Sequence, residues 1–180
     1  LEALRWNTTG ICNVAIGAGA LLSNSGGSWN NAIGVDALVS NSTGDSNVAI
    51  GYNAMFVNST GSGNTAIGHN ALWCNSTGSL NDGVGQGSLA FNSTGSGNVG
   101  MGSETLLLNT EGEYNAALGR QALRHNETGS YNTASGSGAL IRNVSGSRNS
   151  ALGIAAGQWC ASGDYNVMVG SSAGGQQANG

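Results

Sequence analysis

The sequence predicts an all-β fold, a parallel β-solenoid (β-roll) of ten 17-residue turns with two short strands per turn. Three observations lead to this fold class. An asparagine recurs every seventeen residues, glycines lie four residues after it and three residues before it, and adjacent apolar pairs occupy positions between them. A fixed period without insertions indicates that each unit packs on its neighbours in the same way, as in stacked repeat proteins. Residues 1–180 are therefore expected to form one repeat domain.

The recurring asparagine is expected to form a ladder of stacked side chains along the solenoid. A second asparagine series begins at Asn7 and keeps the same period as far as Asn143, and Cys160 takes the next place in it. Asparagine tolerates a left-handed backbone, and stacked side-chain amides can hydrogen-bond to their copies. Seven members of the second series are also Asn-x-Ser/Thr sequons, which an Asn-Ser-Thr-Gly corner explains structurally. The first ladder consists of Asn13, Asn30, Asn47, Asn64, Asn81, Asn98, Asn115, Asn132, Asn149 and Asn166.

The repeat unit is too short for a useful helix but has room for two strands. In the unit that begins at Asn64, the first strand is expected within residues 64–68 and the second around Ala71-Leu72. The glycines, such as Gly61 and Gly68, are expected at both corners of the turn with positive φ, which glycine adopts at little cost.

Both faces of the first strand are predicted to be apolar. The second residue after each ladder asparagine is usually alanine or glycine, and the third is usually a large aliphatic residue. Neighbouring strand residues point to opposite faces, so the small residues can fill a thin interior while the large ones need a cover. A lone solenoid would expose a long apolar stripe, which favours a closed cyclic oligomer. The candidates for the subunit interface of this oligomer are Ile16, Ile33, Ile50, Ile67, Leu118 and Leu152.

Composition argues against several function classes. The net charge is −4 with five Lys and Arg residues, so a nucleic-acid partner is not expected. No apolar run approaches the roughly 18 residues of a transmembrane helix, so membrane insertion is not expected. Cys12, Cys74 and Cys160 lie several turns apart, which predicts no internal disulfide, and we interpret them as buried small hydrophobes. The histidines and acids show no catalytic or metal-binding spacing, so we expect neither enzymatic activity nor a cofactor.

The phrases Asn47-Val-Ala-Ile-Gly51 and Asn64-Thr-Ala-Ile-Gly68 resemble the N-x-A-I-G head repeats of trimeric autotransporter adhesins. The longer phrase from Asn58-Ser-Thr-Gly to Asn70-Ala-Leu resembles repeats of bacteriophage and virus tail fibres. The resemblance covers nearly the whole chain. It implies a left-handed β-roll, a homotrimer, and an extracellular location on a virion tail fibre or a bacterial surface. The adhesin repeat is shorter, so a larger outer loop is expected here.

Variable positions of the repeat are the candidates for recognition. Four consecutive turns place Tyr114, Tyr131, Arg148 and Tyr165 directly before the ladder asparagine, where they would stack into an aromatic and cationic strip. This strip could bind a sugar face or a partner protein, or it could only cover a turn. A second variable pair, which includes Phe56-Val57 and Trp73-Cys74, is interpreted as subunit interface or outer core.

These observations favour a structural and adhesive fibre segment, a rigid trimeric rod that presents repeated weak contacts to a host-cell glycan or protein. The alternative is a stand-alone recognition solenoid, either a glycan-binding lectin or an ice-binding protein. Its hydroxyl array would come from Ser42-Thr43, Ser59-Thr60, Ser76-Thr77 and Ser93-Thr94. The ends carry no capping pattern, so a segment of a longer fibre is expected.

Overall fold

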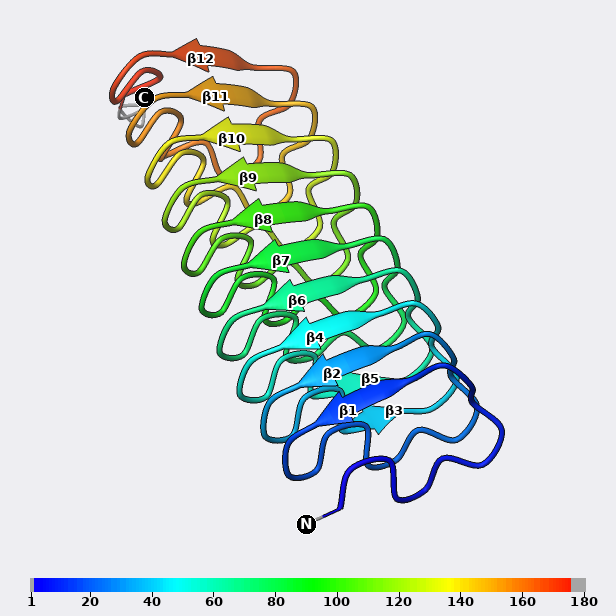
Figure 1. The fold of residues 1–180 in the computed structure, drawn as a ribbon. Coiled ribbons are helices and arrows are strands. Elements are labelled where there is room, and N and C mark those ends of the chain that lie inside the picture. Colours follow the sequence, from blue (N-terminus) through cyan, green and yellow to red (C-terminus); the bar gives the residue numbers. More distant parts are fainter. Residues whose placement is uncertain (1, 176–180) are drawn as a thin grey trace.

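The computed structural model describes residues 2–175 as a β-solenoid of about nine 17-residue turns (Figure 1). Ten strands stack in one parallel sheet in the order β1-β2-β4-β6-β7-β8-β9-β10-β11-β12, and β3 and β5 pair in a second sheet. The strands are β1 (Val14–Ile16), β2 (Asn31–Ile33), β3 (Ser40–Asn41), β4 (Val48–Ile50), β5 (Val57–Asn58), β6 (Thr65–Ile67), β7 (Asp82–Val84), β8 (Val99–Met101), β9 (Ala116–Leu118), β10 (Thr133–Ser135), β11 (Ser150–Leu152) and β12 (Val167–Val169). The predicted all-β parallel solenoid with a 17-residue period is confirmed.

The register of the large sheet follows the repeat period. Ala32 of β2 pairs with Ala15 of β1 and with Ala49 of β4, so equal repeat positions form columns along the solenoid. The middle residue of each strand points inward, and Ala32 and Ala49 are fully buried. The third residue points outward, as at Ile33 and Ile50. The predicted division between a small inner face and a large outer face is confirmed for these strands.

The prediction of two strands per turn is wrong for most of the chain. Apart from the large sheet, strand pairing within residues 2–175 is limited to β3 with β5 and an isolated bridge between Val57 and Cys74. The reason lies in the Ala-Leu pair, whose leucine has a left-handed backbone, with φ of 51° at Leu38 and 48° at Leu72. This conformation turns both residues of the pair inward, and Ala71 and Leu72 are each fully buried.

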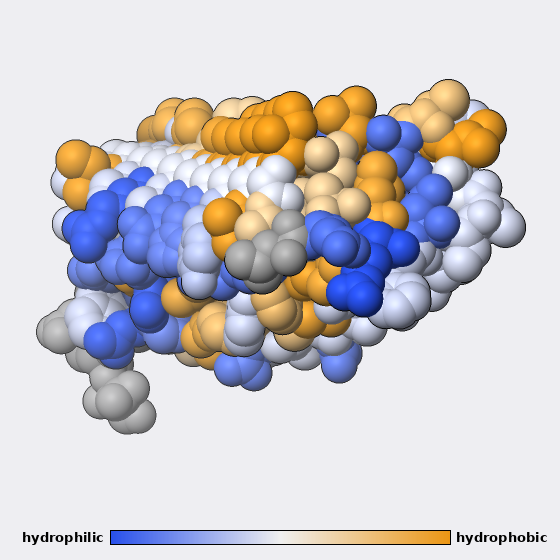
Figure 2. All heavy atoms as spheres, turned by 60° about the horizontal axis from the view of Figure 1, so that its bottom comes forward, coloured by the Kyte–Doolittle hydropathy of each residue, from blue (hydrophilic) through white to orange (hydrophobic). Residues whose placement is uncertain are grey.

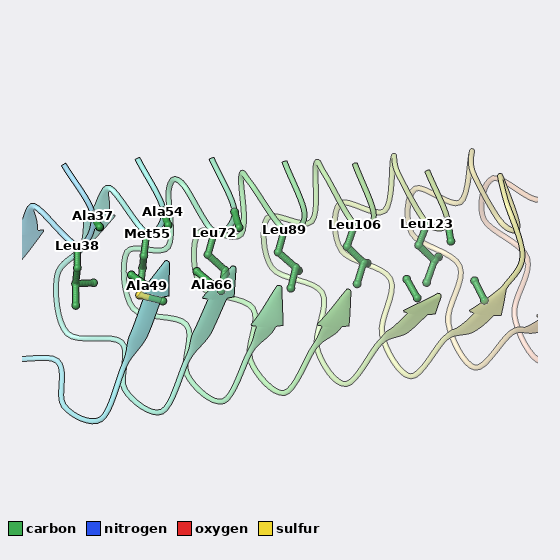
Figure 3. Close-up of a cluster of buried hydrophobic side chains, with 14 of the residues drawn as sticks. Ala37, Leu38, Ala49, Ala54, Met55, Ala66, Leu72, Leu89, Leu106 and Leu123 are labelled. Atoms are coloured by element: carbon green, nitrogen blue, oxygen red, sulfur yellow. The ribbon is translucent and has the colours of Figure 1, made fainter. Parts of the chain in front are cut away.

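The interior is a column of large side chains flanked by alanines (Figure 3). Its large members are seven leucines and one methionine, all fully buried, from Leu21 through Met55 to Leu140. Burial of such a side chain contributes about 1.5–3 kcal/mol. A left-handed residue costs about 1–2 kcal/mol. Burial of each leucine therefore offsets the backbone strain that it carries.

The interior lies between two walls, the large sheet and the Ala-Leu turns. Where one wall carries an unusually small residue, the other carries a larger one, and the reverse. Where the sheet supplies Gly100 in place of alanine, the other wall supplies Ser88 and Thr105, whose hydroxyl oxygens lie 2.7 Å apart. A Cβ added to Gly100 would lie 2.6 Å from Ser88 Oγ and 2.9 Å from Thr105 Oγ1. Met168 occupies the usual alanine position of the last strand, and Gly157 then replaces the leucine, because a Cβ there would lie 2.8 Å from the methionine sulfur. A smaller residue on one wall is thus matched by a larger residue on the other, as close packing requires.

The two glycine columns have different physical reasons. Gly51, four residues after a ladder asparagine, has a φ of 135°, which other residues rarely adopt. Gly44, three residues before a ladder asparagine, lies outside the positive-φ region. A Cβ at Gly44 would overlap the Gly61 carbonyl oxygen and the Asn58 side-chain amide of the next turn. The prediction of positive φ at both corners is therefore wrong for the second corner, where close stacking of the turns excludes a side chain.

Hydrogen bonds join the first asparagine series from turn to turn. The backbone N–H of Asn47 donates to Asn30 Oδ1 at 2.9 Å, and the same bond recurs at each step from Asn13 to Asn166. The Asn30 side-chain amide in turn donates to the Gly44 carbonyl at 2.8 Å. Each side chain therefore links the start of a strand to the corner of the following turn.

The second asparagine series forms side-chain to side-chain bonds. Asn41 Nδ2 donates to Asn24 Oδ1 at 2.6 Å and to the Gly44 carbonyl at 2.9 Å. The side chains from Asn24 to Asn143 are fully buried. A glycan on a sequon asparagine of this buried run would break these bonds, so the folded corner is incompatible with glycosylation there.

Candidate functional site

The outer face of the large sheet exposes a row of large apolar side chains, here called the outer sheet face. All six interface candidates from the sequence lie on it, and Met101 joins them. Between 37% and 58% of the surface of each of these residues is exposed, although all stand on hydrogen-bonded strands. An apolar ridge runs along the molecule in Figure 2. The members of the outer sheet face are Ile16, Ile33, Ile50, Ile67, Met101, Leu118 and Leu152.

The predicted aromatic and cationic strip forms one continuous stack. The Tyr114 and Tyr131 rings lie with centroids 5.2 Å apart and 18° between their planes. The Arg148 guanidinium carbon lies 5.6 Å from the Tyr131 ring and 5.3 Å from the Tyr165 ring. Arg148 Nη1 also donates to the Tyr165 hydroxyl at 2.8 Å. The structure therefore brings all four residues together on an exposed surface.

The left-handed backbone explains why the strip points outward. Each of its four residues has a φ between 53° and 60°. The other non-glycine members of this column, such as Trp29 and Leu80, have the same conformation and are also exposed. This column supplies the positive φ that the sequence analysis assigned to the neighbouring glycines.

The second variable pair forms an aromatic cluster over the middle turns. The Trp73 ring lies 6.4 Å from Phe56 and 5.7 Å from Phe91, and it meets Phe91 edge to face. Near the last turns the Arg142 guanidinium lies 4.1 Å from the Trp159 ring. These side chains are half-buried or exposed, so the cluster is an outer layer over the solenoid.

A hollow of about 280 Å³ opens beside this cluster, and the sequence analysis missed it. Its walls include Asn70, Trp73, Gln86, Phe91, Glu104 and Leu107. Gly87 and Ala90 also line it, and both are smaller than the residues at the same positions of the neighbouring turns. Asn70 and Glu104 flank Gly87, and Trp73 and Leu107 flank Ala90. The signal that could have revealed it is that one turn carries small residues at both positions, Gly87 and Ala90, while the turns directly before and after carry larger ones.

Glu104 is the charged group of this hollow. Gln121 Nε2 and Arg124 Nε both donate to Glu104 Oε2, at 2.9 Å and 3.0 Å. The hydrogen bond from Gln121, and after it the bond and charge of Arg124, lower the pKa of the Glu104 carboxyl below its ordinary value. The carboxylate is therefore ionised at neutral pH and paired with a cation.

Two of the acidic side chains, Asp45 and Asp164, have structural partners. Asp45 and Asp164 each accept a hydrogen bond from a backbone N–H, of Ser28 and Ser147 respectively, at 2.7 Å. In residues 2–175 no group of three or more His, Cys, Asp or Glu side chains is arranged to hold a metal ion. The hydroxyl array is exposed at Thr43, Thr60, Thr77 and Thr94, and Glu111 follows it in the column.

The three cysteines are free. The interpretation of all three as buried is wrong, because Cys12 is exposed and Cys74 and Cys160 are only half-buried. Cys12 belongs to the left-handed outward column, with a φ of 57°, which places its side chain at the surface.

No helix in the described part of the chain has the length and hydropathy needed to cross a membrane. Comparison with protein-family models, with curated proteins and with solved structures finds no match for this chain.

Proposed function

We propose that this chain is a non-enzymatic structural and adhesive fibre segment, of a phage or virus tail fibre or of a bacterial surface adhesin. In this proposal three left-handed solenoids pack through their outer sheet faces into an extracellular homotrimeric rod. The rod holds repeated surface contacts for a host-cell glycan or protein, so weak single contacts add up.

The observation that carries the proposal is the outer sheet face itself. Monomeric proteins rarely expose a contiguous apolar patch of more than a few hundred Å². Here the same column of aliphatic side chains is repeated on successive strands, roughly 4.8 Å apart. A cyclic arrangement buries this stripe along the full length of each chain and leaves the strip at Tyr114, Tyr131, Arg148 and Tyr165 as a separate surface for recognition.

Light scattering after size-exclusion chromatography tests the assembly. The expected mass is three times the 17.8 kDa of the chain, independent of loading concentration in the micromolar range. A monomer that is stable over that range would contradict the trimer and leave the apolar face unexplained. Binding of the fluorescently labelled trimer to intact cells or to a glycan array tests the adhesive role.

A further inference from the structure

The hollow beside Trp73 is not a feature of every turn. It arises because Gly87 and Ala90 are smaller than the residues at the same positions of the neighbouring turns. Residue 87 stands in a column whose members at the adjacent turns are Asn70 and Glu104. All three residues have left-handed φ values, 56° at Asn70, 64° at Gly87 and 56° at Glu104. The backbone is thus the same, and only the side chain is missing. A Cβ at Gly87 would point into the hollow, 3.5 Å from Leu107 Cδ1 and 3.8 Å from Glu104 Cγ.

One wall of the hollow is apolar and the rim is polar. Trp73, Phe91 and Leu107 supply the wall. The rim carries the side-chain amides of Asn70 and Gln86 and the carboxylate of Glu104. A pocket with aromatic faces and a few convergent polar groups is the usual form of a small-molecule site.

The rim groups have unused hydrogen-bonding capacity. Asn70 Oδ1 is buried and has no hydrogen-bond partner in residues 2–175, so its amide gains a bond by turning towards a ligand hydroxyl. Both donors to Glu104 reach the same oxygen, Oε2, which leaves Oε1 as an acceptor for a ligand. A purely apolar occupant would use neither acceptor, whereas a ligand with hydroxyl groups can donate a hydrogen bond to each.

The charge and the volume of the hollow further restrict the class of ligand that it can bind. Arg124 already pairs with Glu104 at 3.0 Å, so the hollow has no uncompensated negative charge to attract a cation. Its volume of about 280 Å³ lies just below the usual range of ligand pockets, which begins at about 300 Å³, and suits one six-membered ring. A ligand that fits the hollow therefore has an apolar face, several hydroxyl groups that donate hydrogen bonds, and no net charge. A neutral sugar ring has all three properties.

We propose that this hollow binds a single neutral pyranose ring, with C–H groups of the ring against the aromatic wall of Trp73 and Phe91 and its hydroxyls on Asn70, Gln86 and Glu104. The site deepens the adhesive part of the proposed function by naming a ligand class and a place for it. It rests on that part alone, because all its residues belong to one chain and the outer sheet face is not involved.

Saturation-transfer NMR with methyl glycosides of glucose, galactose and mannose, and with N-acetylglucosamine, tests the site on the full 180-residue chain. We expect transfer to at least one of these sugars, together with a shift of the Trp73 indole N–H signal in a ¹⁵N spectrum. Gly87→Asn fills the hollow and suits the left-handed backbone, so it should weaken binding at least tenfold.

Two matched controls separate binding from folding. Gly138→Asn changes the same repeat position at nearly the same φ, 67°, where an added Cβ has no atom within 4 Å, and should leave binding unchanged. Asn70→Ala should weaken binding, whereas Asn53→Ala should not, although Asn53 Oδ1 is equally buried and unpartnered. Gly87→Asn and Gly138→Asn proteins with the same affinity would overturn the inference.

Other results also decide the question. Absence of transfer to every sugar of the panel from the folded protein overturns the inference, and so does binding of tetramethylammonium without binding of any glycoside. A trimer by light scattering that binds no sugar refutes the pocket and keeps the assembly. A monomer that binds a sugar refutes the assembly and keeps the pocket.

Discussion

The side-chain oxygen of Asn143 is buried without a hydrogen-bond partner among residues 2–175, because the next position of its ladder is Cys160. One ladder step elsewhere shows what is missing, since Asn75 Nδ2 donates to Asn58 Oδ1 at 2.9 Å. A thiol cannot replace that donor, and Cys160 Sγ instead lies 3.9 Å from the Gly163 carbonyl oxygen. The ladder therefore ends in an unsatisfied acceptor.

Replacing Cys160 with asparagine should restore the missing bond. We expect Cys160→Asn to raise the free energy of unfolding by about 1–3 kcal/mol, because a buried orphan acceptor gains its donor. Urea denaturation followed by circular dichroism measures this difference. Cys12→Asn is the control, since it makes the same chemical change at an exposed site and should alter stability by less than about 0.5 kcal/mol. Equal effects of the two changes would refute the explanation.

The exchange of volume between opposite walls predicts a strong coupling. Gly100→Ala should destabilise the chain by about 1–3 kcal/mol, because the added methyl group overlaps the hydroxyls of Ser88 and Thr105. In the Ser88→Ala, Thr105→Ala background, which restores the residue usual at those positions, most of this cost should disappear. Unfolding free energies of the single, double and triple variants measure the coupling. Additive effects would show that the two walls do not share the space.

Charges on the outer sheet face should prevent assembly. We expect the Ile50→Asp, Ile67→Asp double variant to become monomeric, because the trimer interface would bury six uncompensated carboxylates, two from each chain. The Thr60→Asp, Thr77→Asp variant places the same charges on another exposed column and should keep the parental mass. Analytical ultracentrifugation compares the two. If the Ile50→Asp, Ile67→Asp variant keeps the parental mass, the subunit interface lies elsewhere on the molecule.

The stacked strip should contribute measurably to stability. Tyr131→Ala removes the ring that contacts both Tyr114 and Arg148, and we expect a loss of about 1–2 kcal/mol in unfolding free energy. Trp29→Ala is matched, since Trp29 has the same left-handed backbone and similar exposure but lies between Cys12 and Ser46. Its loss should be smaller. If the two variants lose the same stability by thermal denaturation, the stack contributes nothing beyond each ring.

Glu104 should make stability depend on acid pH. Its pKa is lowered in the folded chain, first by Gln121 and then by Arg124, so the stabilisation is present above the ordinary pKa and is lost as pH falls below it. The stability difference between the parent and Glu104→Gln should therefore shrink as pH falls from 6 towards 3, which chemical denaturation at a series of pH values would measure. Glu127→Gln, at an exposed acid, is the control. A difference that stays constant with pH would refute the role of the carboxylate.

Much of this fold could be predicted from the repeat, and the failures have specific physical causes. The 17-residue period predicted that equal repeat positions stack in columns. The alternation of Ala49 and Ile50 predicted which residues face inward and which face outward. The second strand was wrong because Leu72 adopts a left-handed φ, which an apolar pair does not reveal without knowledge of where each side chain packs. The hollow was missed because Gly87 matters only in relation to the larger residues one turn before and one turn after it.

The sequence by itself determined the parallel register, the length of the turn and the side of the strand that each residue occupies. These depend on spacing along the chain, because a fixed period stacks equal repeat positions on one another and successive residues of a strand point to opposite faces. Only the tertiary structure decided the conformation of the Ala-Leu turn and the hollow beside Trp73. These depend on side chains from neighbouring turns that meet across 17 residues, where packing volume and left-handed backbone geometry outweigh the local pattern.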